Sequence, residues 1–487
     1  MTTTLIKNAD WIIAWNKALA RHEYLQHGDI AFAEDRLTFV GQGYRGSVDR
    51  EIDGRGRMVM PGFVNIHSHP TSEPFNKGLM EERGSPRLGM SSLYEFMLLV
   101  RPDDDARRAA ALYAVAELIK SGVTTFTDYS APRRNWADDL ASTGIRACLA
   151  PSYRSAQWFT PNGHRVEYRW DEAAGRAAMT AALAIVDAAN AHPSGRLFGM
   201  IAPAQVDTCT EELLGASVEA AKARNAPLQI HAAQSVVEFR EMVARHGKTP
   251  LKWLHDLGFL YEGAIIAHCI FIDEHSWIRW PYRGDLERMA AAGASVAHCP
   301  NIFARRGILL ENFGKYRSRG INIGLGTDTF PHNFIDEMRW ATVACKIAGG
   351  SVEATSLDEV FHAATVGGAK ALRRADIGRL AVGCKADLSL VDLRHPTLQP
   401  VRDPLKSLVF SGLERPITDV FVDGEHILVA GKLKTIDEAT VVEALNRGQR
   451  EALANVPAAD YAHRPTDEIF PLSLPITAAP AHDRRTG

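Results

Sequence analysis

The sequence has few cysteines, no marked excess of charge of either sign and no long apolar run. Six cysteines among 487 residues are too few for a disulfide framework, which indicates a reducing compartment. With 55 basic and 58 acidic residues the formal net charge is −3, so nothing predicts a nucleic-acid partner or a membrane-binding patch. No apolar run approaches the length of a membrane span, about 20 residues. The N-terminus lacks the basic start and the apolar core of a signal peptide, so no signal peptide is predicted. These absences predict a cytoplasmic globular protein.

Two kinds of pattern alternate along the chain. Residues 1–60 and 376–440 contain short apolar stretches broken by Gly, Asn and Asp turns, which predict a β-rich region in two parts. In residues 61–375, apolar strands alternate with long stretches that carry apolar residues at helical spacing, which favours a parallel sheet covered by helices. Residues 441–487 are expected to form a helix followed by an extended tail.

The central segment contains eight strand candidates, the number found in a (β/α)₈ barrel. We therefore predict an α/β fold in which the two β-rich flanks come together as a second, discontinuous domain. The candidates are GFVNIH (62–67), GVTTFTD (122–128), IRACLAPS (145–152), LFGMIAP (197–203), LQIHAA (228–233), AIIAHCI (264–270), SVAHCP (295–300) and INIGLGTD (321–328).

Four of these strands carry histidine near their ends, and an aspartate closes the eighth. In such barrels the catalytic groups lie at the C-terminal ends of the strands, so we expect these side chains to converge. Imidazole nitrogens and a carboxylate suit a divalent transition metal ion, zinc especially, with a position left for water. The residues, in chain order, are His67, His69, His231, His268, His298 and Asp328.

We assign four of these residues to one metal ion. Such an ion lowers the pKa of bound water from about 16 towards roughly 7 and so provides a nucleophile at neutral pH. His268 is expected to hydrogen-bond that water or the oxygen that develops in the transition state. Taken singly, each histidine is better explained as a buried core residue, and Asp328 is also explained as a helix cap; their recurrence at strand ends in barrel order favours the metal site. The predicted ligands are His67, His69, His231 and Asp328.

Several longer motifs extend from about residue 5 to about residue 440. They are MVMPGFVNIHSHP, AELIKSGVTTFTD, IHAAQS, VAHCPNIFARRG, GINIGLGTD, ATVGGAKAL, IGRLAVGCKADLSLVDL and VFVDGEHILVAGK. Together they resemble the amidohydrolase superfamily, in the branch of aminohydrolases, deaminases and triazine chlorohydrolases, with a possible link to relatives that cleave ureas and thiocarbamates. The resemblance implies a distorted TIM barrel with a small composite β-sandwich domain built from both flanks.

The same resemblance implies a metal centre and a kind of substrate. The family's ligands correspond to the four residues assigned above, and its second-sphere histidine corresponds to His268. The fourth strand, LFGMIAPAQVD, has no lysine, which implies one metal ion per subunit rather than two. Zinc is favoured, but iron, cobalt and manganese suit the same ligands. Small-molecule substrates and a homo-oligomer, a dimer or larger, are also implied.

Two positions depart from the pattern of deaminases and chlorohydrolases in this branch. Three residues after the fifth-strand histidine these enzymes carry a glutamate that shuttles protons, and here the position is Gln234. Ring deamination requires protonation of a ring nitrogen, and an amide cannot exchange a proton near neutral pH. After the HCP motif of the seventh strand, a Ser-Asn pair is replaced by Ile302 and Phe303 following Asn301, which favours a more apolar pocket.

These departures favour hydrolysis of a C–N or C–S bond at the carbonyl of a small amide, urea or carbamate-like substrate. His268, Asp328 and Gln234 are the expected catalytic residues; Asp328 would accept the proton of water and return it to the leaving group. An alternative is a deaminase or chlorohydrolase of an N-heterocycle, in which another acid, such as Glu73 or Glu238, replaces the usual glutamate. A catalytically inactive barrel that acts as a binding protein is a third possibility, against which the complete set of predicted metal-site residues speaks.

Three side chains are expected to contact the substrate. Trp158 follows the third strand, whereas His298 and Phe303 lie at and after the end of the seventh. All three therefore belong to the end of the barrel that carries catalytic groups in this fold.

Overall fold

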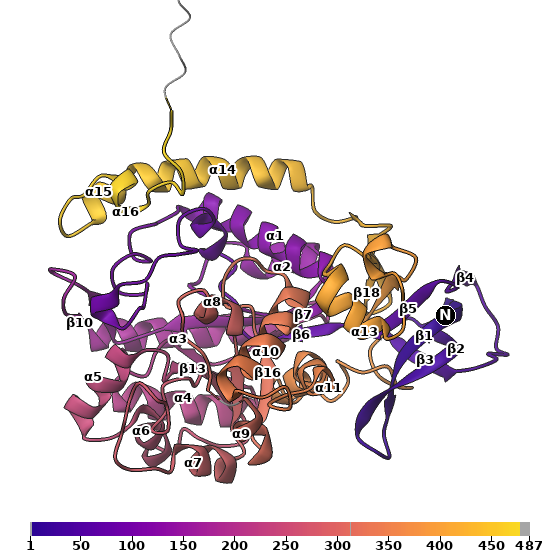
Figure 1. Ribbon diagram of the computed structural model, residues 1–487, viewed down its shortest axis with the longest axis horizontal. Helices are drawn as coiled ribbons and strands as arrows, with labels where there is room; N and C mark the ends of the chain where they lie inside the picture. Colours follow the sequence, from indigo (N-terminus) through magenta and orange to yellow (C-terminus); the bar gives the residue numbers. More distant parts are fainter. Residues whose placement is uncertain (1, 312, 478–487) are drawn as a thin grey trace, which may run out of the picture.

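A computed structural model of the chain describes residues 2–311 and 313–477, so the last part of the predicted tail, residues 478–487, lies outside the described residues. A barrel of parallel strands surrounded by helices forms most of the molecule, and a β-rich sheet lies at one side of it (Figure 1). The predicted α/β fold is confirmed. Among the described helices, none has the length and apolar character needed to cross a membrane.

The barrel wall contains all eight predicted strands, of which the fourth is split in two. One parallel sheet has the order β11-β8-β7-β6, with β12 paired to β8, and the other has the order β13-β14-β15-β16. The strands are β6 (Phe63–Asn65), β7 (Val123–Ser130), β8 (Arg146–Tyr153), β11 (Leu197–Gly199), β12 (Ala202–Pro203), β13 (Leu228–Ala232), β14 (Ala264–His268), β15 (Ser295–His298) and β16 (Asn322–Leu325).

Isolated backbone contacts close the two sheets into a distorted barrel. At the seam between β16 and β6, Asp328 N donates to His67 O at 2.9 Å. At the seam between β12 and β13, Gln205 and His231 form an isolated parallel bridge. Both contacts involve residues that were predicted to bind the metal, so the contacts that close the barrel also bring these residues together.

Helices cover the outside of the barrel and one end of it. Long helices begin at residues whose side chains accept a backbone N–H of the first turn, as Asp103 does for α1 and Asp171 for α3; such caps stabilise helix starts. The helices are α1 (Asp104–Lys120), α2 (Trp136–Ser142), α3 (Glu172–Asn190), α4 (Glu211–Arg224), α5 (Val236–His246), α6 (Pro250–Asp256), α7 (Asp285–Ala292), α8 (Pro300–Ala304), α9 (Phe313–Ser318), α10 (Phe334–Gly349), α11 (Leu357–His362), α12 (Gly368–Ala371), α13 (Pro404–Ser407), α14 (Glu438–Ala454), α15 (Val456–Ala459) and α16 (Thr466–Ile469).

Several shorter segments connect these elements. An antiparallel pair follows β8, and single helical turns punctuate the loops. These segments are β9 (Ala156–Phe159), β10 (Glu167–Trp170), η1 (Glu73–Asn76), η2 (Pro86–Leu88), η3 (Ala363–Gly367), η4 (Pro396–Leu398) and η5 (Leu408–Gly412).

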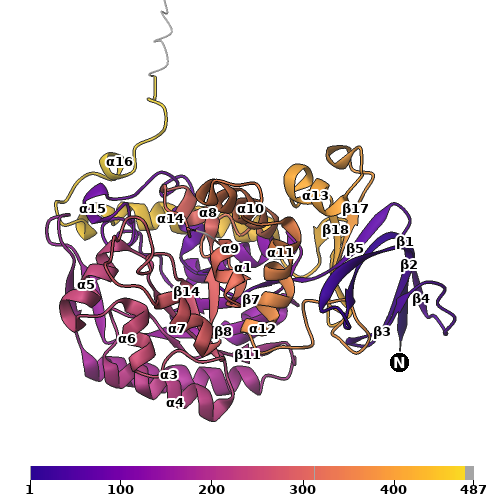
Figure 2. The ribbon, with the colours of Figure 1, turned by 60° about the horizontal axis from the view of Figure 1, so that its bottom comes forward.

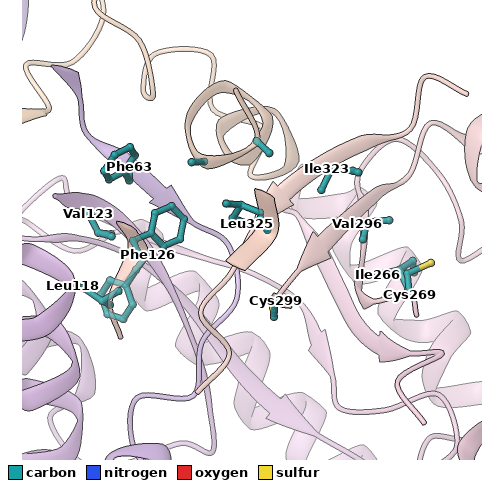
Figure 3. Packing of buried hydrophobic residues seen from close by; sticks show 14 of the residues in the cluster. Phe63, Leu118, Val123, Phe126, Ile266, Cys269, Val296, Cys299, Ile323 and Leu325 are labelled. Atoms are coloured by element: carbon teal, nitrogen blue, oxygen red, sulfur yellow. The ribbon is translucent and has the colours of Figure 1, made fainter. Parts of the chain in front are cut away.

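Barrel side chains alternate between the interior and the surrounding helices. On β14, Ile265 and Ala267 belong to the cluster inside the barrel, whereas Ile266 belongs to the larger cluster outside it. This is the two-residue period of a strand. Figure 3 shows part of the outer cluster, in which Phe126 of β7 and Leu118 of α1 are both fully buried. The alternating apolar residues of the central segment therefore form two layers of hydrophobic core, one inside the barrel and one between the barrel and its helices.

The two flanks of the chain form one nine-stranded sheet, seen at the right of Figure 2. Its order is β20-β19-β18-β17-β5-β1-β2-β3, with β4 paired to β1. The N- and C-terminal parts meet where β5 and β17 run antiparallel, with Leu388 opposite Pro61. The strands are β1 (Thr3–Asn16), β2 (Arg21–Ala33), β3 (Arg36–Gly41), β4 (Arg50–Asp53), β5 (Arg57–Pro61), β17 (Leu388–Asp392), β18 (Ile417–Val422), β19 (Glu425–Val429) and β20 (Lys432–Leu433).

The C-terminal helix α14 lies along α1 in Figure 1 and holds the first loop of the barrel. Gln449 Nε2 donates to the backbone oxygens of Phe75 and Lys77, at 2.7 and 2.9 Å. Gly448 lies so close to α1 and to this loop that a Cβ there would stand 2.6 Å from the side chain of Ala106 in α1 and 3.0 Å from that of Phe75 in the loop. The predicted helix near the C-terminus is therefore an integral part of the barrel cover.

A fully buried arginine connects the barrel to the β-rich sheet. Arg146, the first residue of β8, donates from Nε and Nη2 to the two carboxylate oxygens of Asp387, at 3.2 and 3.1 Å. Its Nη2 also donates to Asp423 Oδ1 at 2.5 Å. Burying a charge is costly, and paired carboxylates offset that cost.

Arg146→Met should therefore lower the free energy of unfolding by about 3–5 kcal/mol, because it leaves the buried carboxylate of Asp387 without its cation. Asp423 keeps an ion pair with Lys385 at 3.0 Å. Denaturant titration followed by circular dichroism measures the change. Arg394→Met is the matched control: Arg394 pairs with Asp392 at the surface, and its loss should cost less than about 1 kcal/mol. Equal destabilisation by the two substitutions would contradict the role assigned to Arg146.

Candidate active site

The residues that the sequence placed at the metal site lie together at or just beyond the C-terminal ends of the strands. Ligand nitrogens of His67, His69 and His231 all lie within 4.8 Å of one another, and so do ligand atoms of His67, His268 and Asp328. Asp328 Oδ1 is 3.4 Å from His67 Nε2 and 3.3 Å from His69 Nε2. The structure thus brings together imidazoles and a carboxylate from four separate strand ends.

Two of the histidines direct the same ring nitrogen to a backbone carbonyl. His69 Nδ1 lies 2.6 Å from Tyr129 O, and His231 Nδ1 lies 2.6 Å from Ala204 O. A carbonyl oxygen can only accept a hydrogen bond, so both Nδ1 atoms carry the proton. In the neutral rings both Nε2 atoms therefore present a lone pair to the centre of the site.

His67 is oriented in the same way by a side chain. Its Nδ1 lies 2.5 Å from Gln229 Oε1, while Gln229 Nε2 donates to Ile66 O at 2.9 Å and so fixes which end of the amide faces the ring. His67 Nε2 is buried and has no hydrogen-bond partner among the described residues. Sequence reasoning missed Gln229, although it lies two residues before His231 and so on the same face of β13.

These protonation states fit a bound cation. The Nε2 atoms of His69 and His231 are only 3.1 Å apart, and two lone pairs at that distance repel each other. Burial lowers the pKa of His231 well below its ordinary value, which keeps the ring neutral. Burial acts to raise the pKa of Asp328, but the surrounding histidines hold it well below its usual range. Asp328 raises the pKa of His69 against the effect of burial, and a bound cation would take the place of the proton on that ring. Imidazole nitrogens and an ionised carboxylate are the donor set of a divalent transition metal site.

The backbone at three strand ends leaves the extended conformation. The φ angle is 54° at Ala233, 75° at His268 and 58° at Asp328, a region that residues other than glycine adopt only at a cost. Glu238 supports the first of these turns, because its carboxylate accepts the backbone N–H of Ala233 at 2.5 Å and of Gln234 at 3.3 Å. Glu238 is thus occupied with the backbone and does not line the cavity described next.

A cavity of about 290 Å³ opens over the cluster. His268 and Gln234, predicted as catalytic, both line it, as do the predicted substrate contacts Trp158 and Phe303. His298 is not among the described residues that line the cavity; its ring packs against Phe313, with the centroids 5.7 Å apart. The ring of His298 thus packs against the first residue of α9, and its contact with a substrate stays a prediction.

Two aromatic side chains give the cavity firmly held apolar walls. Trp158 Nε1 donates to Asp207 Oδ2 at 2.9 Å, and Tyr168 donates its hydroxyl proton to the same oxygen at 2.8 Å. Phe303 lies edge-on to His268, with the centroids 4.8 Å apart. Aromatic faces fixed in this way suit a planar ring.

Among the residues that the structure describes, one carboxyl group besides Asp328 lines the cavity, that of Glu73. Glu73 begins η1, its backbone N donates to His69 O at 3.2 Å, and its Oε2 accepts from Asn76 Nδ2 at 3.1 Å. Burial raises the pKa of Glu73 to about 7. From the sequence it was only one of two alternative acids, since nothing in the pattern shows that the loop after His69 turns back into the barrel.

Comparison with known proteins agrees with this geometry. The pattern of the amidohydrolase family matches residues 58–427. The chain belongs to the amidohydrolase family. Two relatives of this amidohydrolase are a 5′-deoxyadenosine deaminase from Methanosarcina mazei, 28% identical over 436 residues (89% of this chain, 95% of that protein), and a 5-methylthioadenosine/S-adenosylhomocysteine deaminase from Pelotomaculum thermopropionicum, 29% identical over 434 residues (87% and 94%).

Solved structures show the same fold. An atrazine chlorohydrolase from Arthrobacter aurescens TC1 in complex with zinc superposes with a TM-score of 0.77 at 22% identity, covering 92% of this chain and 100% of the other. An adenosine deaminase from Xanthomonas campestris with bound zinc gives a TM-score of 0.77 at 21% identity, covering 93% and 98%.

The amidohydrolase is accordingly a metal-dependent hydrolase of carbon–nitrogen bonds other than peptide bonds. The relatives favour the deaminase alternative over the amide or urea hydrolysis that Gln234 suggested. The sequence-based preference for a carbonyl substrate is therefore the weaker of the two interpretations.

His231→Ala should reduce bound metal to a small fraction of one ion per chain, because it removes a ligand nitrogen. Gln229→Leu should weaken metal affinity by about 10–100-fold, the usual effect of losing the partner that orients a ligand. Elemental analysis after reconstitution with Zn²⁺, Fe²⁺, Co²⁺ or Mn²⁺ measures both effects. His463→Ala, which changes an exposed histidine, should bind metal like the parent; full metal content in His231→Ala would refute the ligand assignment.

Proposed function

We propose that this amidohydrolase is a deaminase that replaces the exocyclic amino group of an N-heterocycle with oxygen from water and releases ammonia. The observation that carries the proposal is the buried carboxyl group of Glu73, which lines the same cavity as His69 and Asp328. Glu73 would supply the proton for the ring nitrogen, which the amide of Gln234 cannot donate. The deaminase relatives, which align over most of their length, support the same reaction.

We propose zinc as the metal, held by the three Nε2 atoms of His67, His69 and His231 and by the carboxylate of Asp328. Two proteins of the same fold are described with zinc. When bound, the ion supplies a Lewis acid that lowers the pKa of water and makes hydroxide available near neutral pH.

The protein's own residues then have to move two protons. A ring nitrogen must be protonated so that the neighbouring carbon accepts an oxygen, and the amino group must be protonated so that it leaves as ammonia. Glu73 is placed to serve the ring nitrogen, and Asp328 to take a proton from water and return it to the amino group. His268, whose pKa burial lowers to about 3, stays neutral and hydrogen-bonds the oxygen that is added.

Glu73→Gln should lower kcat for ammonia release by about 10²–10⁴-fold, the usual contribution of a positioned acid, and should leave metal content unchanged. The assay is ammonia release over a panel of aminopurines, aminopyrimidines and aminotriazines. Glu82→Gln changes an exposed carboxylate of the same loop and should retain parental activity. Similar activity in the two variants would rule out Glu73 as the acid.

A second candidate is the hydrolysis of a small amide, urea or thiocarbamate. Gln234 lines the cavity, and its amide can donate a hydrogen bond to a substrate carbonyl oxygen. Ile302 and Phe303 add apolar surface beside it. Amine release from amides or ureas by the parent, without ammonia from any heterocycle, would favour this candidate, especially if Gln234→Glu alone introduced deamination.

A further inference from the structure

Two hydroxyl groups connect the cavity wall to a fully buried carboxylate. Thr71 lies in the loop after His69, Ser130 is the last residue of β7, and both line the cavity. Thr71 Oγ1 donates to Ser130 Oγ at 3.0 Å, and Ser130 Oγ donates to Asp128 Oδ1 at 2.5 Å. The reaction proposed above uses neither hydroxyl.

The buried end of this hydrogen-bond chain is fixed by a tryptophan and an arginine. Asp128 Oδ2 accepts from Trp136 Nε1 at 2.7 Å and from Arg133 Nη1 at 3.1 Å. The side chain of Arg133 is only 2% exposed, so this ion pair is shielded from water. A carboxylate paired with a guanidinium accepts hydrogen bonds and donates none. Ser130 must therefore be the donor in its bond with Asp128.

The direction of the chain decides what Thr71 presents to the cavity. A hydroxyl group has one proton and two lone pairs. Ser130 directs its proton to Asp128 and so accepts from Thr71, which in turn directs its own proton to Ser130. Thr71 Oγ1 thus faces the cavity with lone pairs and without a proton.

The two hydroxyls lie where an unmatched group is costly. Thr71 is 7% and Ser130 is 4% exposed. A buried acceptor without a donor destabilises the state that contains it, and a ligand that brings a donor removes this cost. A site built to bind an O–H or N–H group accordingly rejects the analogue that lacks it. An apolar group beside Thr71 would leave its oxygen unpaired, and a second acceptor would repel it.

We propose that Thr71, oriented by Ser130 and Asp128, determines specificity by accepting a hydrogen bond from an O–H or N–H group of the substrate. The inference rests on the proposed deaminase function for the identity of the ring, but not for the donor. This donor is distinct from the amino group that leaves, because the proposed reaction assigns that group to Asp328. The substrate class is then an amino-substituted N-heterocycle that carries a second hydrogen-bond donor.

The test compares matched ligands in which a donor is replaced by a methyl group, on the metal-loaded, full-length protein. Adenines with hydroxymethyl or ethyl at C2, and with hydroxyethyl or propyl at N9, are compared by kcat/KM for ammonia release. Quinolines with hydroxymethyl or ethyl at C2 or at C4 are compared by their dissociation constants. In each set we expect at least one pair to favour the alcohol by at least about fivefold, the lower end of the cost of an unpaired buried acceptor. The difference should lie in KM rather than in kcat.

Substitutions assign the preference to Thr71. Thr71→Val keeps the shape of the side chain without its oxygen, so the ratio between alcohol and alkyl ligand should fall to one or below. Thr71→Ser retains the hydroxyl and should retain the preference. Thr180→Val, which changes an exposed threonine of α3, should keep the parental ratio. Parental metal content in each variant shows that the barrel has folded.

Ser130→Ala tests the direction of the chain separately. Without Ser130 the proton of Thr71 is free to turn towards the cavity and to donate. The methyl ether of the preferred quinoline alcohol can only accept, and its affinity should rise by about 2–10-fold, the usual effect of one hydrogen bond. The ethyl analogue should not gain. An ether that gains no more than the ethyl analogue would contradict the role assigned to Ser130.

The outcomes separate this inference from the proposed reaction. The quinolines have no amino group, so their binding does not depend on deamination. A preference for the alcohol that is lost in Thr71→Val, without ammonia from any heterocycle, would support the acceptor and refute the deaminase. Equal affinity within every pair would refute the acceptor. A preference that survives in Thr71→Val would also refute it, because the alcohol would then bind elsewhere, at the metal cluster.

Discussion

The whole site depends on the backbone hydrogen bonds that close the barrel between its first and last strands. Asp328 N donates to His67 O at 2.9 Å, and His69 N donates to Asp328 O at 2.8 Å. These bonds hold three ligand-bearing residues from opposite ends of the barrel segment in one place. The neighbouring wall then sets the ring orientations, since carbonyls of Tyr129 and Ala204 receive the Nδ1 protons. The site is thus pre-organised by the same contacts that make the barrel, which limits the conformational cost of holding a metal.

The position of a site residue can be predicted from the sequence when the residue lies on a strand with regular periodicity, but not when it lies in a loop. The eight strands and the meeting of His67, His231 and Asp328 follow from apolar periodicity and the rule that strand ends converge. His268 and His298 mark the limit of that rule. Both occur in the tripeptide Ala-His-Cys at a strand end, yet only His268 has a positive φ, and only its ring reaches the cavity.

The position of the acid, Glu73, could not be predicted for the same reason. In the sequence, Gln234 occupies the position at which the deaminases that this chain resembles carry a glutamate. This difference argues against ring deamination. Glu73 lies in a loop whose direction no periodicity specifies, and it nevertheless lines the cavity. Chemistry requires an acid at a position in space rather than at a position in the chain. A substitution on one strand can therefore be compensated by a loop of another, and the fold permits this because all its loops open into the same cavity.

The attachment of α14 has a consequence for biosynthesis. The loop that carries Glu73 is fastened by Gln449, which follows Phe75 by 374 residues in the chain. During translation the N-terminal part of a chain leaves the ribosome first and begins to fold, so this loop lacks its tether until the residues of α14 have been synthesised. A nascent chain that has not yet reached α14 therefore lacks the two hydrogen bonds that hold the loop of its acid.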